Sequence, residues 1–141
     1  MTQTFSSNSV AETEAIAAEL AQSLQGGECI ALHGDLGAGK TQFVRGLVRG
    51  LGGNPRAVSS PTFVLLNVYD GGRLTVYHLD AYRVAGADDF EAIGFSELLD
   101  QPSGVVVVEW AERVRSLLPP KCIDVRIEPI GEGRRHIEID R

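Results

Sequence analysis

Apolar residues recur with a helical period in two stretches near the start of the chain. In residues 10–25 they lie four residues apart, at Ile16, Leu20 and Leu24. In residues 40–51 they fall at Phe43, Val44, Leu47, Val48 and Leu51. This spacing puts apolar side chains on one helical face, so we predict a helix in each stretch. Ser9 and Glu12 fit a capping box at the start of the first helix, and a Gly-Gly pair follows each helix.

Strand patterns occupy much of the remaining chain. We expect strands at residues 28–33, 62–70, 73–80, 104–110, 122–130 and 135–140. The sequence Asp-Gly-Gly at residues 70–72 predicts a hairpin turn. The valine-rich run at 104–110 is typical of a strand covered on both faces, whereas the last two strands alternate as an antiparallel pair with one solvated face does. Short helices are expected at 88–100, with a break at Gly94, and at 111–118.

Helices and strands therefore alternate through a chain of 141 residues, of which 43% are hydrophobic and 23% charged. These values are ordinary for a globular protein that buries a core. We predict one α/β domain spanning residues 1–141, with helices on both faces of a mixed parallel and antiparallel sheet.

Composition narrows the possible functions. The formal net charge is −6, which disfavours nucleic-acid binding through a broad positively charged surface. We see no apolar run long enough to cross a membrane and no secretory signal at the N-terminus, so we expect a cytoplasmic protein. Cys29 and Cys122 are isolated and lack metal-ligand spacing, and Cys29 fits a small buried side chain. The three histidines are also scattered, and we interpret them as structural.

The first candidate site is the loop "GDLGAGKT" at residues 34–41, which lies between a predicted strand and a predicted helix. This arrangement is the P-loop in its required context. Its backbone N–H groups and the helix N-terminus bind phosphate oxygens, Lys40 reaches the β- and γ-phosphates, and the Thr41 hydroxyl binds Mg²⁺. The predicted nucleotide-binding residues are Gly34, Asp35, Leu36, Gly37, Ala38, Gly39, Lys40, Thr41 and Gln42. The fold is then expected to be a three-layer P-loop NTPase fold.

Two acids end predicted strands near this loop. Asp80 follows "LTVYHL" and Glu109 follows four valines. Ligands of open α/β sheets bind at the carboxyl ends of parallel strands, which favours a catalytic or metal-binding role for both over solvated strand ends. The segment "SSPTF" at residues 59–63 contains Thr62, which fits either a γ-phosphate sensor or an ordinary turn.

Four segments, "GDLGAGKT", "SSPTF", "YHLDAYR" and "VEWAER", occur in this order. Together they resemble the TsaE family of bacterial P-loop ATPases over about residues 8 to 135. The resemblance implies ATP or ADP as ligand with Mg²⁺, and slow hydrolysis by the protein alone. It also implies work with the TsaB and TsaD proteins, which transfer a threonylcarbamoyl group to adenosine 37 of tRNAs that read ANN codons. tRNA would then be reached indirectly, through that complex.

Site residues carry over from the resemblance position by position. Thr41 and Glu109 match Mg²⁺ positions, Asp80 matches an acid needed for activity, and Thr62 belongs to the switch-like segment. Trp110 matches the tryptophan beside the metal acid. Segments near Ser9 to Thr13 and near Gly133 match regions that approach the nucleotide. The predicted catalytic residues are therefore Lys40, Thr62, Asp80 and Glu109.

Other functions fit parts of the pattern. A small-molecule P-loop kinase would use the same loop but form a phosphorylated product. A nucleotide-gated binding subunit would dock on its partners when loaded, and its hydrolysis would be incidental. A direct tRNA-binding protein is disfavoured by the acidic balance.

Overall fold

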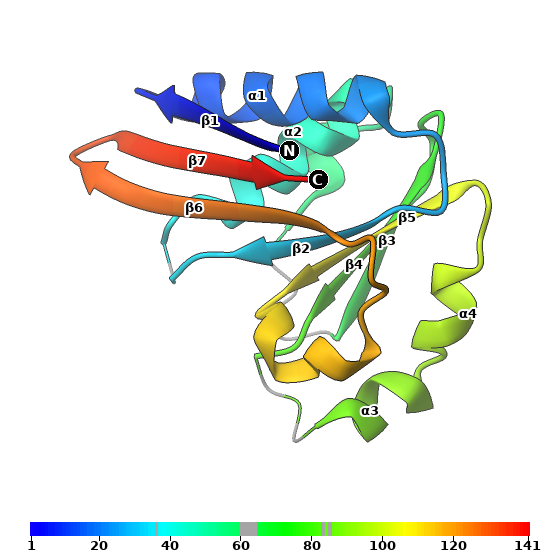
Figure 1. The fold of residues 1–141 in the computed structure, drawn as a ribbon. Coiled ribbons are helices and arrows are strands. Elements are labelled where there is room, and N and C mark those ends of the chain that lie inside the picture. The colour runs from blue at the N-terminus through cyan, green and yellow to red at the C-terminus, as the bar shows by residue number, and fades with distance from the viewer. Residues whose placement is uncertain (36, 60–64, 83, 85) are drawn as a thin grey trace.

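Seven strands form a single mixed sheet in this computed structural model, which describes residues 1–35, 37–59, 65–82, 84 and 86–141 (Figure 1). The strands are β1 (Thr2–Ser7), β2 (Cys29–His33), β3 (Leu66–Tyr69), β4 (Thr75–Asp80), β5 (Gly104–Glu109), β6 (Ile123–Gly131) and β7 (Arg134–Asp140). Their order across the sheet is β1-β7-β6-β2-β5-β4-β3. The four central strands β6, β2, β5 and β4 are parallel, and antiparallel partners extend the sheet on both sides.

Helices cover both faces of this sheet, which gives three layers (Figure 1). They are α1 (Val10–Ser23), α2 (Lys40–Gly50), α3 (Ala87–Ala92) and α4 (Phe95–Leu99), with 3-10 segments η1 (Pro55–Ala57) and η3 (Ala111–Leu117). One apolar cluster lies between the sheet and the α1–α2 pair. A second lies between the opposite face and α3, α4 and η3. No helix in the described part of the chain combines the length and apolar character that a membrane span needs.

The predicted α/β class, the three layers and the mixed sheet are confirmed. Ser9 caps α1 as predicted: the Glu12 N–H donates to Ser9 Oγ at 3.1 Å. Glu12 Oε1 reaches back to accept from the N–H of Asn8, the residue before the N-cap, and not from that of Ser9. Cys29 is buried as predicted. The hairpin strand expected at 62–70 is β3, Leu66–Tyr69, and residues 62–64 lie outside the described residues.

Strand β1 was not predicted from the sequence. Its residues "TQTFSS" include one large apolar side chain, Phe5, so no buried face is evident. The strand forms because β7 offers an unpaired edge, with Thr2 opposite Asp140 and Ser7 opposite Arg135. Backbone hydrogen bonds to an available sheet edge therefore stabilise this strand, although its side-chain pattern does not predict one.

Helices α1 and α2 pack closely because α2 presents two glycines to α1. A Cβ atom built at Gly46 would lie 2.3 Å from the Glu14 carbonyl oxygen, and one at Gly50 would lie 2.7 Å from the Ala18 carbonyl oxygen. These partners are backbone atoms, which cannot turn aside as a side chain can. The glycines therefore set how close the two helices lie, and with it the position of α2 against the sheet.

Gly46→Ala should destabilise the protein although alanine is the better helix former. Helix propensity favours alanine by about 1 kcal/mol, whereas overpacking against backbone costs about 1–3 kcal/mol. We expect the clash to exceed the propensity gain and to lower the urea midpoint of unfolding. Glu19→Ala, at an exposed position of α1, is the control and should change stability by less than about 0.5 kcal/mol. An unchanged or higher midpoint for Gly46→Ala would contradict the close packing.

Candidate nucleotide site

The loop between β2 and α2 has the backbone conformation that its glycines allow. Gly37 has φ of 80° and Gly39 has φ of 108°, values that side-chain-bearing residues rarely adopt. Gly39 is the N-cap of α2 and supplies no side-chain hydrogen bond to it. The N–H groups of the first helical turn therefore have no side-chain cap, as a phosphate-binding helix N-terminus requires. Arg135 Nε donates to the Ala38 carbonyl at 2.7 Å and holds the loop from β7.

Lys40, the first residue of α2, lies almost wholly inside the protein with 6% of its side chain exposed. Its Nζ is 3.7 Å from Glu109 Oε1, within ion-pair range but too long for a hydrogen bond, and 4.2 Å from the centre of the Trp110 ring. Among the described residues Nζ has no hydrogen-bond acceptor. A buried ammonium with unused N–H groups normally carries a large cost. The position of this ammonium therefore fits a site that binds a ligand with anionic oxygens.

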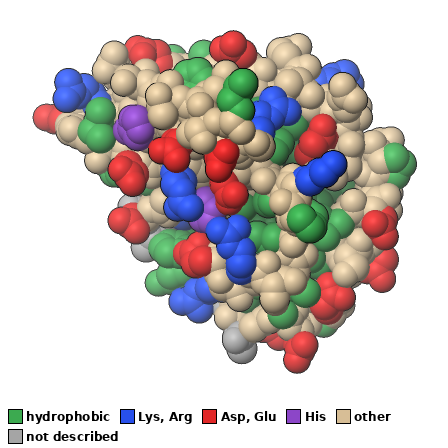
Figure 2. Space-filling model, in the orientation of Figure 1, with side chains coloured by type: hydrophobic (Ala, Val, Ile, Leu, Met, Phe, Trp, Pro, Cys, Tyr) green, Lys and Arg blue, Asp and Glu red, His purple; other side chains and the backbone are tan. Residues whose placement is uncertain are grey.

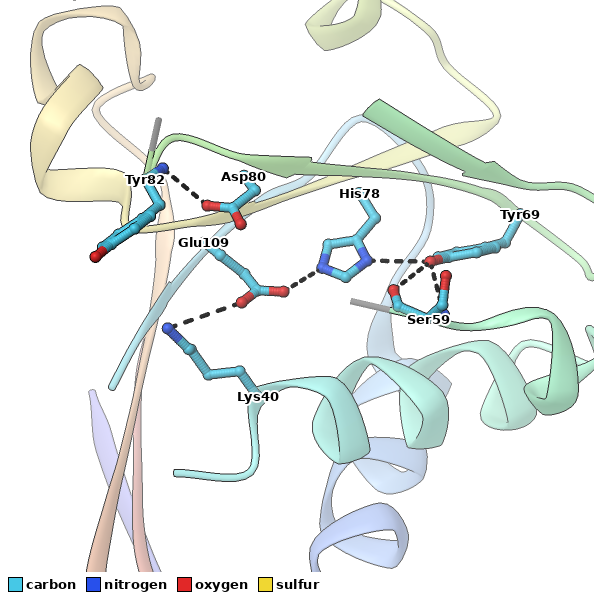
Figure 3. A network of polar contacts seen from close by, with 7 residues as sticks. All are labelled: Lys40, Ser59, Tyr69, His78, Asp80, Tyr82 and Glu109. Atoms are coloured by element: carbon cyan, nitrogen blue, oxygen red, sulfur yellow. Dashed lines mark hydrogen bonds and ion pairs between the residues drawn. The ribbon is translucent and has the colours of Figure 1, made fainter. Parts of the chain in front are cut away.

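Asp80 and Glu109 meet where β4 and β5 end side by side, and they are register partners in this parallel pair. Both acids therefore lie at the carboxyl end of a parallel strand, as expected from the sequence, and the strand register places them side by side. Asp80 Oδ1 accepts the Tyr82 N–H at 2.8 Å. Burial raises the pKa of the Asp80 carboxyl; the Tyr82 N–H opposes this rise, and the neighbouring Glu109 charge adds to it. The two carboxylates and Lys40 thus share one buried corner of the site (Figure 3).

The second oxygen of Glu109 faces His78. This contact was not predicted from the sequence, in which the three histidines are scattered and were interpreted as structural. Glu109 Oε2 is 2.5 Å from His78 Nε2, and His78 Nδ1 is 3.2 Å from the Tyr69 hydroxyl (Figure 3). His78 is fully buried. The signal for it was the period of two along β4, which puts residues 76, 78 and 80 on the same face of the strand. Tyr69 had no comparable signal, because its place depends on the pairing of β3 with β4.

Trp110 follows Glu109 with a left-handed backbone, at φ of 56° and ψ of 41°. A bulky residue seldom adopts this conformation, and such strain concentrates at functional positions. Its ring lies over Lys40 Nζ and 5.0 Å from the Tyr82 ring. The turn after β5 thus directs an aromatic side chain over the buried ammonium.

Other predicted residues lie around the loop, and two lie outside the described residues. Thr41 stands beside Lys40 in the first turn of α2. A pocket adjoins the loop on the side of α1 and the β6–β7 turn, and its lining includes Ser9, Thr13, Gly39, Gln42, Gly133 and Arg135. It brings together segments more than 90 residues apart in the sequence. Leu36 and Thr62 fall outside the described residues.

Comparison with known proteins identifies the relatives of this chain. The family model "Threonylcarbamoyl adenosine biosynthesis protein TsaE" matches residues 7–137. The chain belongs to the TsaE family. A TsaE protein of Treponema pallidum is 46% identical over 82% of this chain and 84% of its own length. One of Aquifex aeolicus is 42% identical over 92% of this chain and 90% of its own length. Both are named tRNA threonylcarbamoyladenosine biosynthesis proteins.

A solved structure supports the same assignment. The crystal structure of Bacillus subtilis YdiB superposes with a TM-score of 0.77 at 32% identity, and covers 99% of this chain and 84% of that one. The P-loop NTPase fold and the family resemblance predicted from the sequence are confirmed. As a TsaE member, the chain has a role in threonylcarbamoyladenosine biosynthesis, and family and fold together indicate nucleotide binding.

Asp80→Asn should stabilise the protein at neutral pH. The pKa of Asp80 is raised on folding, so its protonated form stabilises the folded state, and this contribution is lost as the pH rises through the raised pKa. Asparagine keeps the oxygen that accepts from Tyr82 but cannot ionise. We therefore expect a higher melting temperature than the parent at pH 7.5, with the difference closing as the pH falls toward 4.

The matched control for this prediction is Asp70→Asn, at an exposed position in the β3–β4 turn. It should show no such pH-dependent gain in melting temperature. A lower melting temperature for Asp80→Asn at pH 7.5 would mean that attraction to Lys40 outweighs the cost of burial.

Proposed function

We propose that this TsaE protein is a Mg²⁺-dependent ATPase for threonylcarbamoylation of adenosine 37 in tRNAs that read ANN codons, working with the TsaB and TsaD proteins. The observation that carries the ATPase part is the buried Lys40 ammonium. It lies at a helix N-terminus without a side-chain cap, next to Glu109, and has no hydrogen-bond acceptor among the described residues. Phosphate oxygens of ATP or ADP satisfy these donors.

Each site residue then has a chemical role. Gly34 to Gln42 hold the phosphates through backbone N–H groups, and the Lys40 ammonium binds oxygens of the β- and γ-phosphates. Thr41 and Glu109 are the residues that would hold Mg²⁺, which needs few protein ligands when phosphates and water complete its shell. The bound ion supplies positive charge at the phosphates. Asp80 holds the attacking water, and Thr62 binds the γ-phosphate.

The pocket beside Gly39 and Gln42 suits the other end of the nucleotide. It begins where the loop ends, and Gly133, with φ of 70°, lines it from the β6–β7 turn. We assign the base and ribose to this pocket. Gly133 is then a nucleotide-binding residue although it lies far from the loop in sequence.

The surface charge supports an indirect role toward tRNA. Acidic and basic side chains are interspersed over the face drawn in Figure 2, and the net charge is −6. Tight binding to nucleic acid relies on many lysines and arginines placed against phosphates. Partners that hold the tRNA, with this protein acting on their complex, fit this charge distribution better.

The deciding experiment measures phosphate release from ATP and Mg²⁺ by the protein alone and with the TsaB and TsaD proteins of the same organism, with and without tRNA. We expect slow release alone and faster release with the partners. A rate of phosphate release that is the same with and without TsaB and TsaD would contradict the proposed partnership. A phosphorylated acceptor in place of free phosphate would show a kinase.

Lys40→Ala should weaken ATP binding by about 10- to 100-fold, because hydrogen bonds to charged groups contribute about 1.5–3 kcal/mol. Isothermal titration calorimetry with ATP and Mg²⁺ measures the change. Lys121→Ala removes an exposed lysine and should leave the affinity unchanged. Parental affinity in the Lys40 variant would refute the phosphate role.

Glu109→Gln should reduce hydrolysis by about 100-fold or more, as the loss of a group that stabilises the transition state does. Its affinity for ADP without Mg²⁺ should change far less, since Lys40 and the loop remain. Single-turnover phosphate release and ADP titration separate the two effects. The control is Glu112→Gln, which changes a side chain that is 55% exposed. Equal turnover in the two variants would contradict the proposed role of Glu109 in metal binding.

A further inference from the structure

A chain of polar contacts runs across three strands from Ser59, at the surface, through buried side chains to the nucleotide site (Figure 3). The Tyr69 hydroxyl accepts the Ser59 N–H at 3.3 Å, and its oxygen lies 3.1 Å from the Ser59 carbonyl oxygen. It also contacts His78, which contacts Glu109, whose other oxygen faces Lys40. The side chains come from three adjacent strands, β3, β4 and β5. Contacts between neighbouring strands thus connect the backbone at Ser59 to the P-loop lysine.

Both oxygens of the Glu109 carboxylate have a set partner. Oε2 contacts His78 Nε2 and Oε1 faces Lys40 Nζ. A carboxylate only accepts hydrogen bonds, so His78 Nε2 carries a proton and donates it. These contacts fix the torsion of the carboxyl group as well as its place. Ordering of this kind by an outer group is what orients a metal-binding carboxylate.

The environment makes these contacts stronger than similar ones at the surface. His78 is fully buried, Glu109 is 4% exposed and Tyr69 is 8% exposed. With little water to compete, hydrogen bonds strengthen and unpaired groups become costly. A buried histidine that served only to fill the core would be replaceable by an apolar residue of similar size. Here the imidazole instead spans the space between the Tyr69 hydroxyl and the candidate metal acid.

We propose that Tyr69 and His78 are positioning residues for Glu109. They hold its carboxylate at the angle needed to bind nucleotide-associated Mg²⁺, and they couple that angle to the backbone position of Ser59. Neither residue is among those that the proposed function assigns to the nucleotide. The inference rests on the proposed function for its Mg²⁺-dependent step, but the orientation itself exists in the nucleotide-free protein and can be measured there.

Trp110 provides a readout that does not depend on turnover. It is the only tryptophan in the chain, it follows Glu109 directly, and its ring lies 4.2 Å from Lys40 Nζ. Its fluorescence therefore reports both the resting site and the binding of ADP with or without Mg²⁺.

The first variant is Tyr69→Phe, which keeps the ring and removes the hydroxyl. Mg²⁺ should tighten ADP binding in the parent, and we expect this Mg²⁺-dependent gain to fall about 10-fold in the variant, as happens when an outer partner of a metal ligand is lost. ADP affinity without Mg²⁺ should remain within about threefold. Tyr77→Phe is the matched control: it removes a hydroxyl from β4 that has no hydrogen bond to a described residue, and it should change neither value.

His78 gives a second, graded test. His78→Gln keeps an amide N–H that reaches toward Glu109, whereas His78→Leu has no donor. We expect the glutamine variant to retain a larger Mg²⁺-dependent gain than the leucine variant. If His78→Leu does not fold, the comparison of Tyr69→Phe with Tyr77→Phe still decides.

A purely structural role predicts a different result. Tyr69→Phe and His78→Gln would then lower the urea midpoint of unfolding but leave the Mg²⁺-dependent gain equal to the parent's, and this result would overturn the proposal. If the parent binds no ADP, the proposed function fails instead. The proposal is then tested by Trp110 emission without nucleotide, which Tyr69→Phe must shift and Tyr77→Phe must not; an unshifted emission would overturn it.

Discussion

Two opposite charges, the Lys40 ammonium and the Glu109 carboxylate, lie 3.7 Å apart with only 6% of each side chain exposed. Neither charge is stable in this environment alone, because an unpaired buried ion carries a large desolvation cost. Their pairing is long and leaves the lysine N–H groups without an acceptor among the described residues. The pair therefore leaves N–H groups of Lys40 available for the phosphate oxygens of the proposed ligand.

The sheet and the α1–α2 packing hold this pair in place from opposite sides. Glu109 ends β5, whose six residues are all buried, and Lys40 begins α2, which glycines hold close against α1. Parallel strands bring Asp80 to the same edge. The backbone therefore sets the positions of three charged groups before any ligand binds, which is the preorganisation that the proposed phosphoryl transfer requires.

Stability and function oppose each other at this edge. The raised pKa of Asp80 means that its ionised form is held against the preference of its surroundings. The left-handed backbone of Trp110 is a second local cost. Such costs persist because the buried apolar clusters on both sides of the sheet supply the compensating free energy.

The sequence alone determined the parts of this protein that depend on local pattern. The P-loop, its flanking strand and helix, and the place of Asp80 and Glu109 at strand ends all follow from local spacing. That the two acids lie side by side depends on the pairing of β4 with β5. Strand β1 was missed because its pairing with β7 depends on an edge that no local pattern reveals. Only the tertiary structure brought Tyr69 and His78 to Glu109, because a contact across three strands depends on register, and register is set by the packing of the whole sheet.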